Sequence, residues 1–144
     1  MFGSACGRKA LPRPPENVVP RQITDLSGTD TTQGIQLSWS RPVTYADGSH
    51  MPDLGGFIVE RAVGDDVRAA FQRISSLDVS DRDRLRQIKR FRYVDQNTEV
   101  GTAYRYRVVS FTIDRYFSAP SNTVPVTRAA AGENTHASFP TTER

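Results

Sequence analysis

The sequence has little of what several classes of protein require. It has one cysteine, Cys6, in 144 residues, which excludes an intrachain disulfide and a multi-cysteine metal site. No apolar run approaches the roughly 20 residues that a membrane-spanning helix needs. Neither of the two histidines has a nucleophile or carboxylate at motif spacing, and glycine-rich phosphate loops and zinc motifs are absent. We therefore expect no catalytic site, no cofactor and no metal, and predict that the chain is not an enzyme.

What the sequence does have is short runs of alternating apolar and polar residues from about residue 18 to residue 128. Gly, Asp, Asn and Pro separate these runs, as is typical of strands joined by turns. Pro125 cannot donate to a ladder and is expected on a sheet edge. We predict seven strands, at Val18 to Leu26, Ile35 to Trp39, Gly56 to Ala62, Phe71 to Leu77, Arg90 to Asp95, Ala103 to Phe111 and Ser121 to Thr127. A helical turn or two is predicted over residues 80–88, with Ser80 as its cap.

Seven such strands predict an all-β sandwich. The alternation assigns a set of side chains to its interior: Trp39, Phe57, Val59, Tyr104, Tyr106 and Val108. Phe71 is a further expected anchor, together with Ile74 or Leu77. Four apolar residues fall at outward positions, where they form either a docking face or scattered exposed residues: Ile58, Val94, Val109 and Phe111.

The stretch LSWSRP, a following Asp-Gly pair and the motif DLGGF resemble bacterial fibronectin type III domains. The matching residues are Trp39, Asp47, Gly48, Leu54, Gly56 and Phe57, and the later stretches VGTAYRYRV and SAPSNTVPV are also similar to that family. The resemblance covers about residues 18–128 and implies an immunoglobulin-like sandwich. It implies that Tyr104 forms a tyrosine corner, with its hydroxyl bonded to upstream backbone.

The sequence departs from the family in two places. Six residues before Tyr104 the family places Leu or Val to plug one end of the sandwich, whereas this chain has Thr98. Val100 is the expected substitute. The loop before the last strand reads DRYF, Asp114 to Phe117, and the chain lacks the Arg-Gly-Asp triplet of integrin-binding members. Cell adhesion by that route is therefore not expected.

The N-terminal residues 1–17 resemble the maturation site of bacterial lipoproteins followed by a tether. Small residues precede Cys6, the expected lipid attachment site, and Pro12, Pro14 and Pro15 favour extended geometry after it. Gly3 departs from the usual Leu, and the basic start and apolar segment of a signal peptide are not in the sequence as given. Either the apparent start lies downstream of the true one, or the chain has been trimmed, or Cys6 is an ordinary thiol. Residues 129–144 are small and polar, which predicts a flexible, disordered tail.

Two regions are candidates for binding a partner. The first is a basic segment, Arg82, Arg84, Arg86, Lys89, Arg90 and Arg92, of which Arg86, Lys89 and Arg90 are the chosen candidates. The second is the loop with Arg115, Tyr116 and Phe117, whose aromatic rings either contact a partner or fold back over the sandwich. Alternatively, the basic segment is only a solvated loop and strand face. Because no aromatic ladder accompanies it, a nucleic-acid partner is not expected. Asp47, His50 and Asp53 are read as a turn and not as a metal site.

These features predict a non-catalytic, membrane-tethered protein-binding or structural module of the bacterial cell envelope, on its periplasmic or outer-surface side. The expected partners are envelope or membrane proteins, with the chain as an accessory subunit of a larger assembly. The alternative is an accessory module that binds a polyanion or a carbohydrate through residues 82–92.

Overall fold

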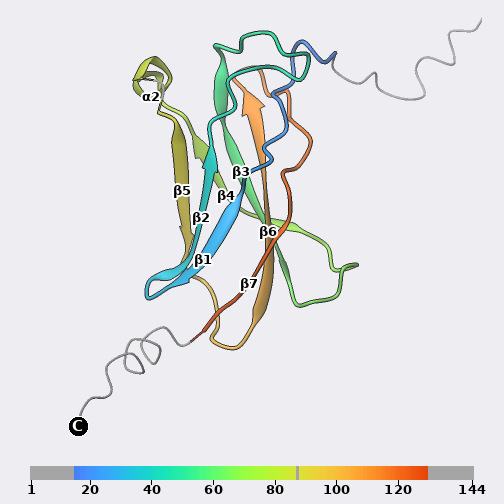
Figure 1. Ribbon diagram of the computed structural model, residues 1–144, viewed down its shortest axis with the longest axis vertical. Coiled ribbons are helices and arrows are strands. Elements are labelled where there is room, and N and C mark those ends of the chain that lie inside the picture. The colour runs from blue at the N-terminus through green and yellow to red at the C-terminus, as the bar shows by residue number, and fades with distance from the viewer. Residues whose placement is uncertain (1–14, 87, 130–144) are drawn as a thin grey trace, which may run out of the picture.

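The computed structural model describes residues 15–86 and 88–129, which form two antiparallel sheets packed face to face (Figure 1). The three-stranded sheet has the order β1-β2-β5, with β1 at Ser27–Thr31, β2 at Gly34–Ser40 and β5 at Arg90–Asp95. The four-stranded sheet has the order β4-β3-β6-β7, with β4 at Gln72–Asp78, β3 at Leu54–Val63, β6 at Ala103–Thr112 and β7 at Val124–Thr127. The seven-stranded immunoglobulin-like sandwich is thus confirmed. Cys6, residues 1–14 of the tether and residues 130–144 of the tail lie outside the described residues.

The first strand is not where the alternation predicts it. Residues Val18–Leu26 form no strand, and β1 follows them at Ser27–Thr31. Ile23 and Leu26 are nevertheless buried, so the apolar pattern was a signal of burial and not of strand geometry. The β1 sequence, SGTDT, has no apolar residue. Its strand form therefore comes from antiparallel pairing with β2 and not from an apolar pattern.

The predicted helical segment forms as α2, Asp81–Arg86. The Asp83 backbone N–H donates to Ser80 Oγ at 3.1 Å, which is the expected cap. Across the described part of the chain, no helix has the length and apolar character needed to cross a membrane. The edge position of Pro125 is also confirmed, since β7 is the outer strand of its sheet.

The core lies between the sheets around Trp39, whose side chain is fully buried. Its ring meets Phe57 edge-on, with centroids 5.2 Å apart, and stacks on Phe91 at 6.4 Å. Such aromatic rings each hide about 150–250 Å² and dominate core energetics. The six residues assigned to the interior are at most 4% exposed: Trp39, Phe57, Val59, Tyr104, Tyr106 and Val108.

Phe71 is not a core anchor. It precedes β4 and is half-buried on the outer face of the four-stranded sheet. The guanidinium groups of Arg105 and Arg107 lie 5.3 Å and 4.1 Å from its ring centre, so cation–π contacts hold it. Ile74 and Leu77 pack against the core instead.

Steric contacts explain why residue 56, in the motif that enters β3, is a glycine. A Cβ at this position would lie 2.2 Å from the Leu77 carbonyl oxygen and 2.7 Å from the Phe111 ring. Only glycine therefore lets β3 approach its neighbours here.

One end of the sandwich, opposite to the β2–β3 loop, is sealed by polar groups, and we call it the closed end. The Glu99 backbone N–H donates to Tyr104 Oη at 2.8 Å, as the tyrosine corner implies. Val100 does not plug this end, because it is 64% exposed. Asp95 does so in its place, at 2% exposure.

Three donors satisfy the buried Asp95 carboxylate. Arg61 Nη1 lies 2.8 Å from Asp95 Oδ2, and Tyr106 Oη donates to the same oxygen at 2.7 Å. The Asn97 backbone N–H donates to Oδ1 at 3.2 Å. Burial, together with the hydrogen bond from Tyr106 Oη to Asp95, raises the pKa of Tyr106 above its ordinary value. The closed end is thus held by a buried ion pair where the family pattern places an apolar plug.

Candidate functional site

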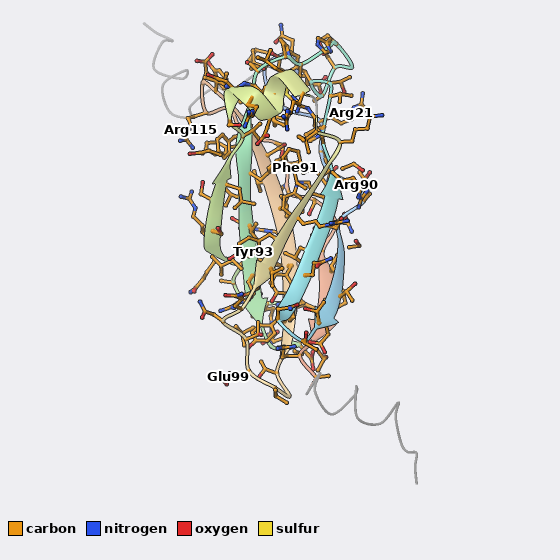
Figure 2. All side chains as sticks on the ribbon, turned by 90° about the vertical axis from the view of Figure 1, so that its left-hand side faces the viewer. Arg21, Arg90, Phe91, Tyr93, Glu99 and Arg115 are labelled. Atoms are coloured by element: carbon orange, nitrogen blue, oxygen red, sulfur yellow. The ribbon has the colours of Figure 1, made fainter. Side chains whose placement is uncertain are left out.

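Segments far apart in the sequence meet at the other end of the sandwich, which we call the loop end (Figure 1). It comprises residues 15–20, the β2–β3 loop (41–53), α2 and the β6–β7 loop beginning at residue 113. Backbone bonds join these segments: Ala46 N–H donates to Val19 O, Arg41 N–H to Lys89 O and Ile113 N–H to Asp53 O. Figure 2 shows Arg115 and Arg90 toward this end and Glu99 at the opposite one. The two candidate regions from the sequence are therefore brought to one end.

The β6–β7 loop partly folds back on the sandwich. The Phe117 ring lies 5.8 Å from the Phe111 ring, and the Arg115 guanidinium lies 4.5 Å above it. Phe111 is consequently 2% exposed, and Ile58 is 6% exposed. Both alternatives for these two residues, a docking face and scattered exposed side chains, are therefore wrong, because both side chains are buried. Tyr116 and Phe117 remain 40% and 45% exposed.

The basic segment divides into structural and exposed cations. Arg84 Nη1 donates to the carbonyls of Leu54 and Val79, both at 2.9 Å, and its guanidinium also pairs with Asp81. Arg90 donates to Ser38 Oγ at 2.8 Å and to Ser40 Oγ at 3.0 Å. It also lies 3.5 Å from an Asp25 carboxylate oxygen. These two arginines are engaged by neighbouring groups, although the Arg90 side chain is still 49% exposed. The other four cations are exposed: Arg82, Arg86, Lys89 and Arg92.

The Asp47, His50 and Asp53 region is a turn. Asp47 Oδ1 accepts bonds from the Ser49 N–H at 2.9 Å and from Ser49 Oγ at 2.6 Å. These bonds lower the pKa of Asp47. Gly48 has φ of 92°, which favours glycine. Among residues 15–86 and 88–129 no group of His, Cys, Asp and Glu is arranged to hold a metal ion.

The carboxylate of Asp53 accepts a hydrogen bond from a tyrosine. Tyr45 Oη donates to Asp53 Oδ1 at 2.7 Å. This bond, with burial, raises the pKa of Tyr45 to about 12. The pair ties the two sides of the β2–β3 loop together.

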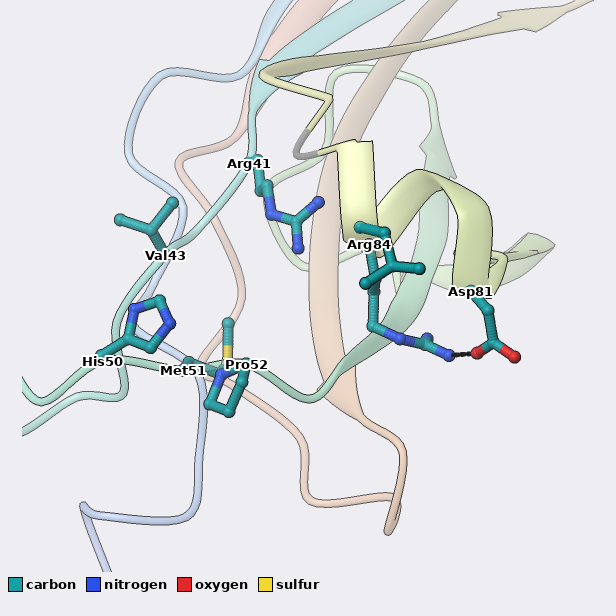
Figure 3. Close-up of a pocket in the computed structure, with 8 residues that line it drawn as sticks. Arg41, Val43, His50, Met51, Pro52, Asp81 and Arg84 are labelled. Carbon is teal, nitrogen blue, oxygen red and sulfur yellow. Dashed lines mark hydrogen bonds and ion pairs between the residues drawn. The ribbon is translucent and has the colours of Figure 1, made fainter.

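A groove that the sequence did not reveal lies between the β2–β3 loop and α2 (Figure 3). It has a volume of about 510 Å³, and a second hollow of about 290 Å³ adjoins it at Arg41 and Val43. We call the two together the Arg41 groove. Its lining residues are Ser40, Arg41, Val43, His50, Met51, Pro52, Asp81, Arg84, Leu85 and Lys89. The sequence held one signal for this groove: Val43 and Leu85 are lone apolar residues among polar ones. In the structure they are 54% and 85% exposed.

Arg41 is the central cation of this groove. Its Nη1 donates to the Asp83 carbonyl at 3.3 Å, and within the described part of the chain it forms no ion pair. Burial and the neighbouring Arg84 charge lower the pKa of Arg41, while Asp83 partly opposes this. Because two guanidinium groups share this space, an anion placed between them would be stabilised.

No family model matches the chain, and no curated protein matches it in sequence. Solved structures are similar in fold. A fibronectin III-like protein from Clostridium thermocellum is 17% identical with a TM-score of 0.54, over 76% of this chain and 94% of that one. The third fibronectin III domain of human KIAA0343 protein is 8% identical with a TM-score of 0.55, over 83% and 90%.

A structure of titin kinase and its flanking domains is also similar, at 17% identity and a TM-score of 0.52. The match covers 84% of this chain but 19% of that one, so this chain corresponds to a small part of it. With the two-sheet topology, these matches identify the fold as that of fibronectin type III domains. At these identities the likeness concerns fold alone.

Proposed function

We propose that the chain is a non-catalytic protein-binding or structural module, tethered to a membrane of the bacterial cell envelope through lipid on Cys6. It would serve as an accessory subunit of a larger assembly. The observation that carries this proposal is that five of the eight exposed large apolar side chains of the described residues lie at the loop end: Val43, Leu85, Ile113, Tyr116 and Phe117. Exposed apolar groups at one end of a rigid frame favour contact with a partner.

The position of the N-terminal segment supports the tether. Glu16 and Val19 accept backbone bonds from Asp47 and Ala46, so the chain reaches the sandwich at the loop end. The nine residue-to-residue steps from Cys6 to Pro15 would reach about 28 Å at polyproline rise. An anchor on Cys6 would therefore keep the loop end near the membrane and raise its concentration beside membrane partners.

The mass of the N-terminal peptide from native membranes tests the tether. We expect a peptide that begins at Cys6 and carries lipid, and a Cys6→Ser variant that leaves the membrane fraction with unchanged Trp39 fluorescence. An intact Met1 with a free Cys6 thiol would remove the tether from the proposal. For the binding role, a photo-crosslinking residue at Phe117 should capture a defined neighbour in cells, whereas the same residue at the exposed Arg73 should not.

Binding of a polyanion or carbohydrate is the second candidate, supported by Arg82 and Arg86, four residues apart on α2, with Lys89 just beyond it. All three are exposed. The internal bonds of Arg84, which is 17% exposed, remove it from this role, whereas Arg90 is bonded to Ser38 but remains 49% exposed. Affinity for heparin that falls steeply with salt would favour this candidate, since polyanion binding releases counterions.

A further inference from the structure

We propose that the Arg41 groove binds an acidic segment of a partner protein. That segment would place an apolar side chain on Val43 and Leu85 and a carboxylate on Arg41. The inference rests on the proposed function as a protein-binding module and goes beyond it by stating the chemistry of the partner.

Apolar side chains line one half of the groove. Val43 from the β2–β3 loop and Leu85 from α2 line it and are 54% and 85% exposed, and the buried Met51 lines it as well. A volume of about 510 Å³ is within the range of specific binding sites. Covering Val43 and Leu85 with one aliphatic or aromatic side chain would remove apolar surface from water, which favours binding.

The charged half has an excess of positive charge. Three cations line the groove, Arg41, Arg84 and Lys89, against one lining carboxylate, Asp81, which already pairs with Arg84. Asp83 adds a second negative charge near Arg41 but forms no ion pair with it. Arg41 donates one hydrogen bond, to the Asp83 backbone carbonyl. Because a guanidinium has five N–H donors, enough remain for a two-pronged bond to a carboxylate.

The recessed position of Arg41 favours a polypeptide over a membrane surface. Arg41 is half-buried in a recess, where an inserted side chain can reach it more easily than a flat bilayer. The exposed cations Arg82, Arg86 and Lys89 would also attract an anionic bilayer. Vesicle binding therefore separates a membrane from a peptide.

Selection from a display library of random peptides, with the full chain as target, tests the proposal. We expect enriched peptides to carry an apolar residue within about two positions of an Asp or Glu. A synthetic peptide with the enriched sequence is then titrated against the full chain and its variants. Arg41→Gln and Val43→Ser should each weaken binding about tenfold. Arg41→Lys should weaken it less, because it keeps the charge and loses the fork.

Arg73→Gln is the matched control, since it removes an exposed arginine from β4, outside the groove, and should change affinity less than about twofold. Near-ultraviolet circular dichroism of Trp39 checks that each variant is folded. Enriched peptides without acidic residues, or binding that is indifferent to Arg41→Gln, would overturn the inference. So would vesicles of phosphatidylglycerol and phosphatidylcholine that bind with the same dependence on Arg41.

Those results leave the proposed function standing, because it is judged separately by the lipid on Cys6 and by the neighbours crosslinked to the native protein. Conversely, a Cys6 without lipid would not affect a peptide that binds through Arg41.

Discussion

The two ends of the sandwich use arginine in opposite ways. At the closed end Arg61 pairs with Asp95 at 2.8 Å, and Arg128 pairs with Asp30 at 2.6 Å, with all four side chains at most 20% exposed. At the loop end Arg41 has no carboxylate partner in the described part of the chain, and Arg86 is exposed. The number of cations therefore does not mark a binding surface. What marks it is whether the fold has already supplied each cation with an anion.

The largest effect should come from removing the buried anion. Asp95→Ala leaves the Arg61 guanidinium unpaired and should cost about 3 kcal/mol of unfolding free energy, the low end for such pairs because Arg61 is 20% exposed. Asp81→Ala, at the loop end, should cost about 0–1 kcal/mol, because its side chain is 89% exposed. Urea unfolding followed by Trp39 fluorescence measures both. Equal losses would abolish the distinction between the ends.

An apolar replacement of the whole network should recover most of that loss. With Arg61→Met, Asp95→Leu and Tyr106→Phe together, no charge is buried, and stability should return to within about 1 kcal/mol of the parent chain. Arg61→Met alone, which leaves Asp95 without its cation, is the control and should remain destabilised in the same urea assay. A triple variant as unstable as the control would mean that shape, and not charge pairing, seals the closed end.

The tyrosine corner should contribute less. Tyr104→Phe removes the acceptor of the Glu99 N–H and should cost about 1–2 kcal/mol. Tyr116→Phe changes an exposed hydroxyl with no partner among the described residues and should cost less than about 0.5 kcal/mol. Thermal unfolding of both variants is the measurement. If Tyr104→Phe were silent, the bond would not stabilise the fold.

Alkaline pH should act on both ends through two tyrosines. The pKa of Tyr45 is raised to about 12 at the loop end, and that of Tyr106 is raised at the closed end, from an ordinary 10.0. Above pH 10 the unfolded chain loses these protons first, so the stability they supply declines between pH 10 and about 12. Urea unfolding across this range should show the decline, and Tyr45→Phe should reduce it. A flat profile would mean that neither hydroxyl is held as described.

The smallest effect is expected from Arg41→Gln, which should change the unfolding free energy by less than about 0.5 kcal/mol. Its side chain makes one bond of 3.3 Å to a carbonyl and no ion pair among the described residues. Differential scanning calorimetry checks this. A loss as large as that of Asp95→Ala would make Arg41 a structural residue and remove the contrast between the ends.

Local alternation was sufficient for most strands because it reports which side chains face the core. It located β2, β3 and β6 and assigned Trp39 and Tyr106 to the interior. It failed for β1, which has no apolar residue and is a strand through pairing with β2. It also failed for Phe71 and Phe111, because cation–π contacts and the β6–β7 loop cover outward rings.

For the candidate site, the sequence indicated the basic segment and the exposed Tyr116 and Phe117, but not which cations were free. Arg84 and Arg90 are engaged by carbonyls and hydroxyls from other strands. The groove around Arg41 forms only where the β2–β3 loop meets α2, about 40 residues further along the chain.

The sequence by itself determined the sandwich and its aromatic core, because strand periodicity and core composition are properties of neighbouring residues. The corner at Tyr104 was implied by the resemblance to fibronectin type III domains. Only the tertiary structure decided that Asp95 plugs one end and that Arg41, at the other, forms no ion pair among the described residues. The partner of a charge depends on which residue the fold places across from it, and for Arg61 and Asp95 that residue is 34 positions away.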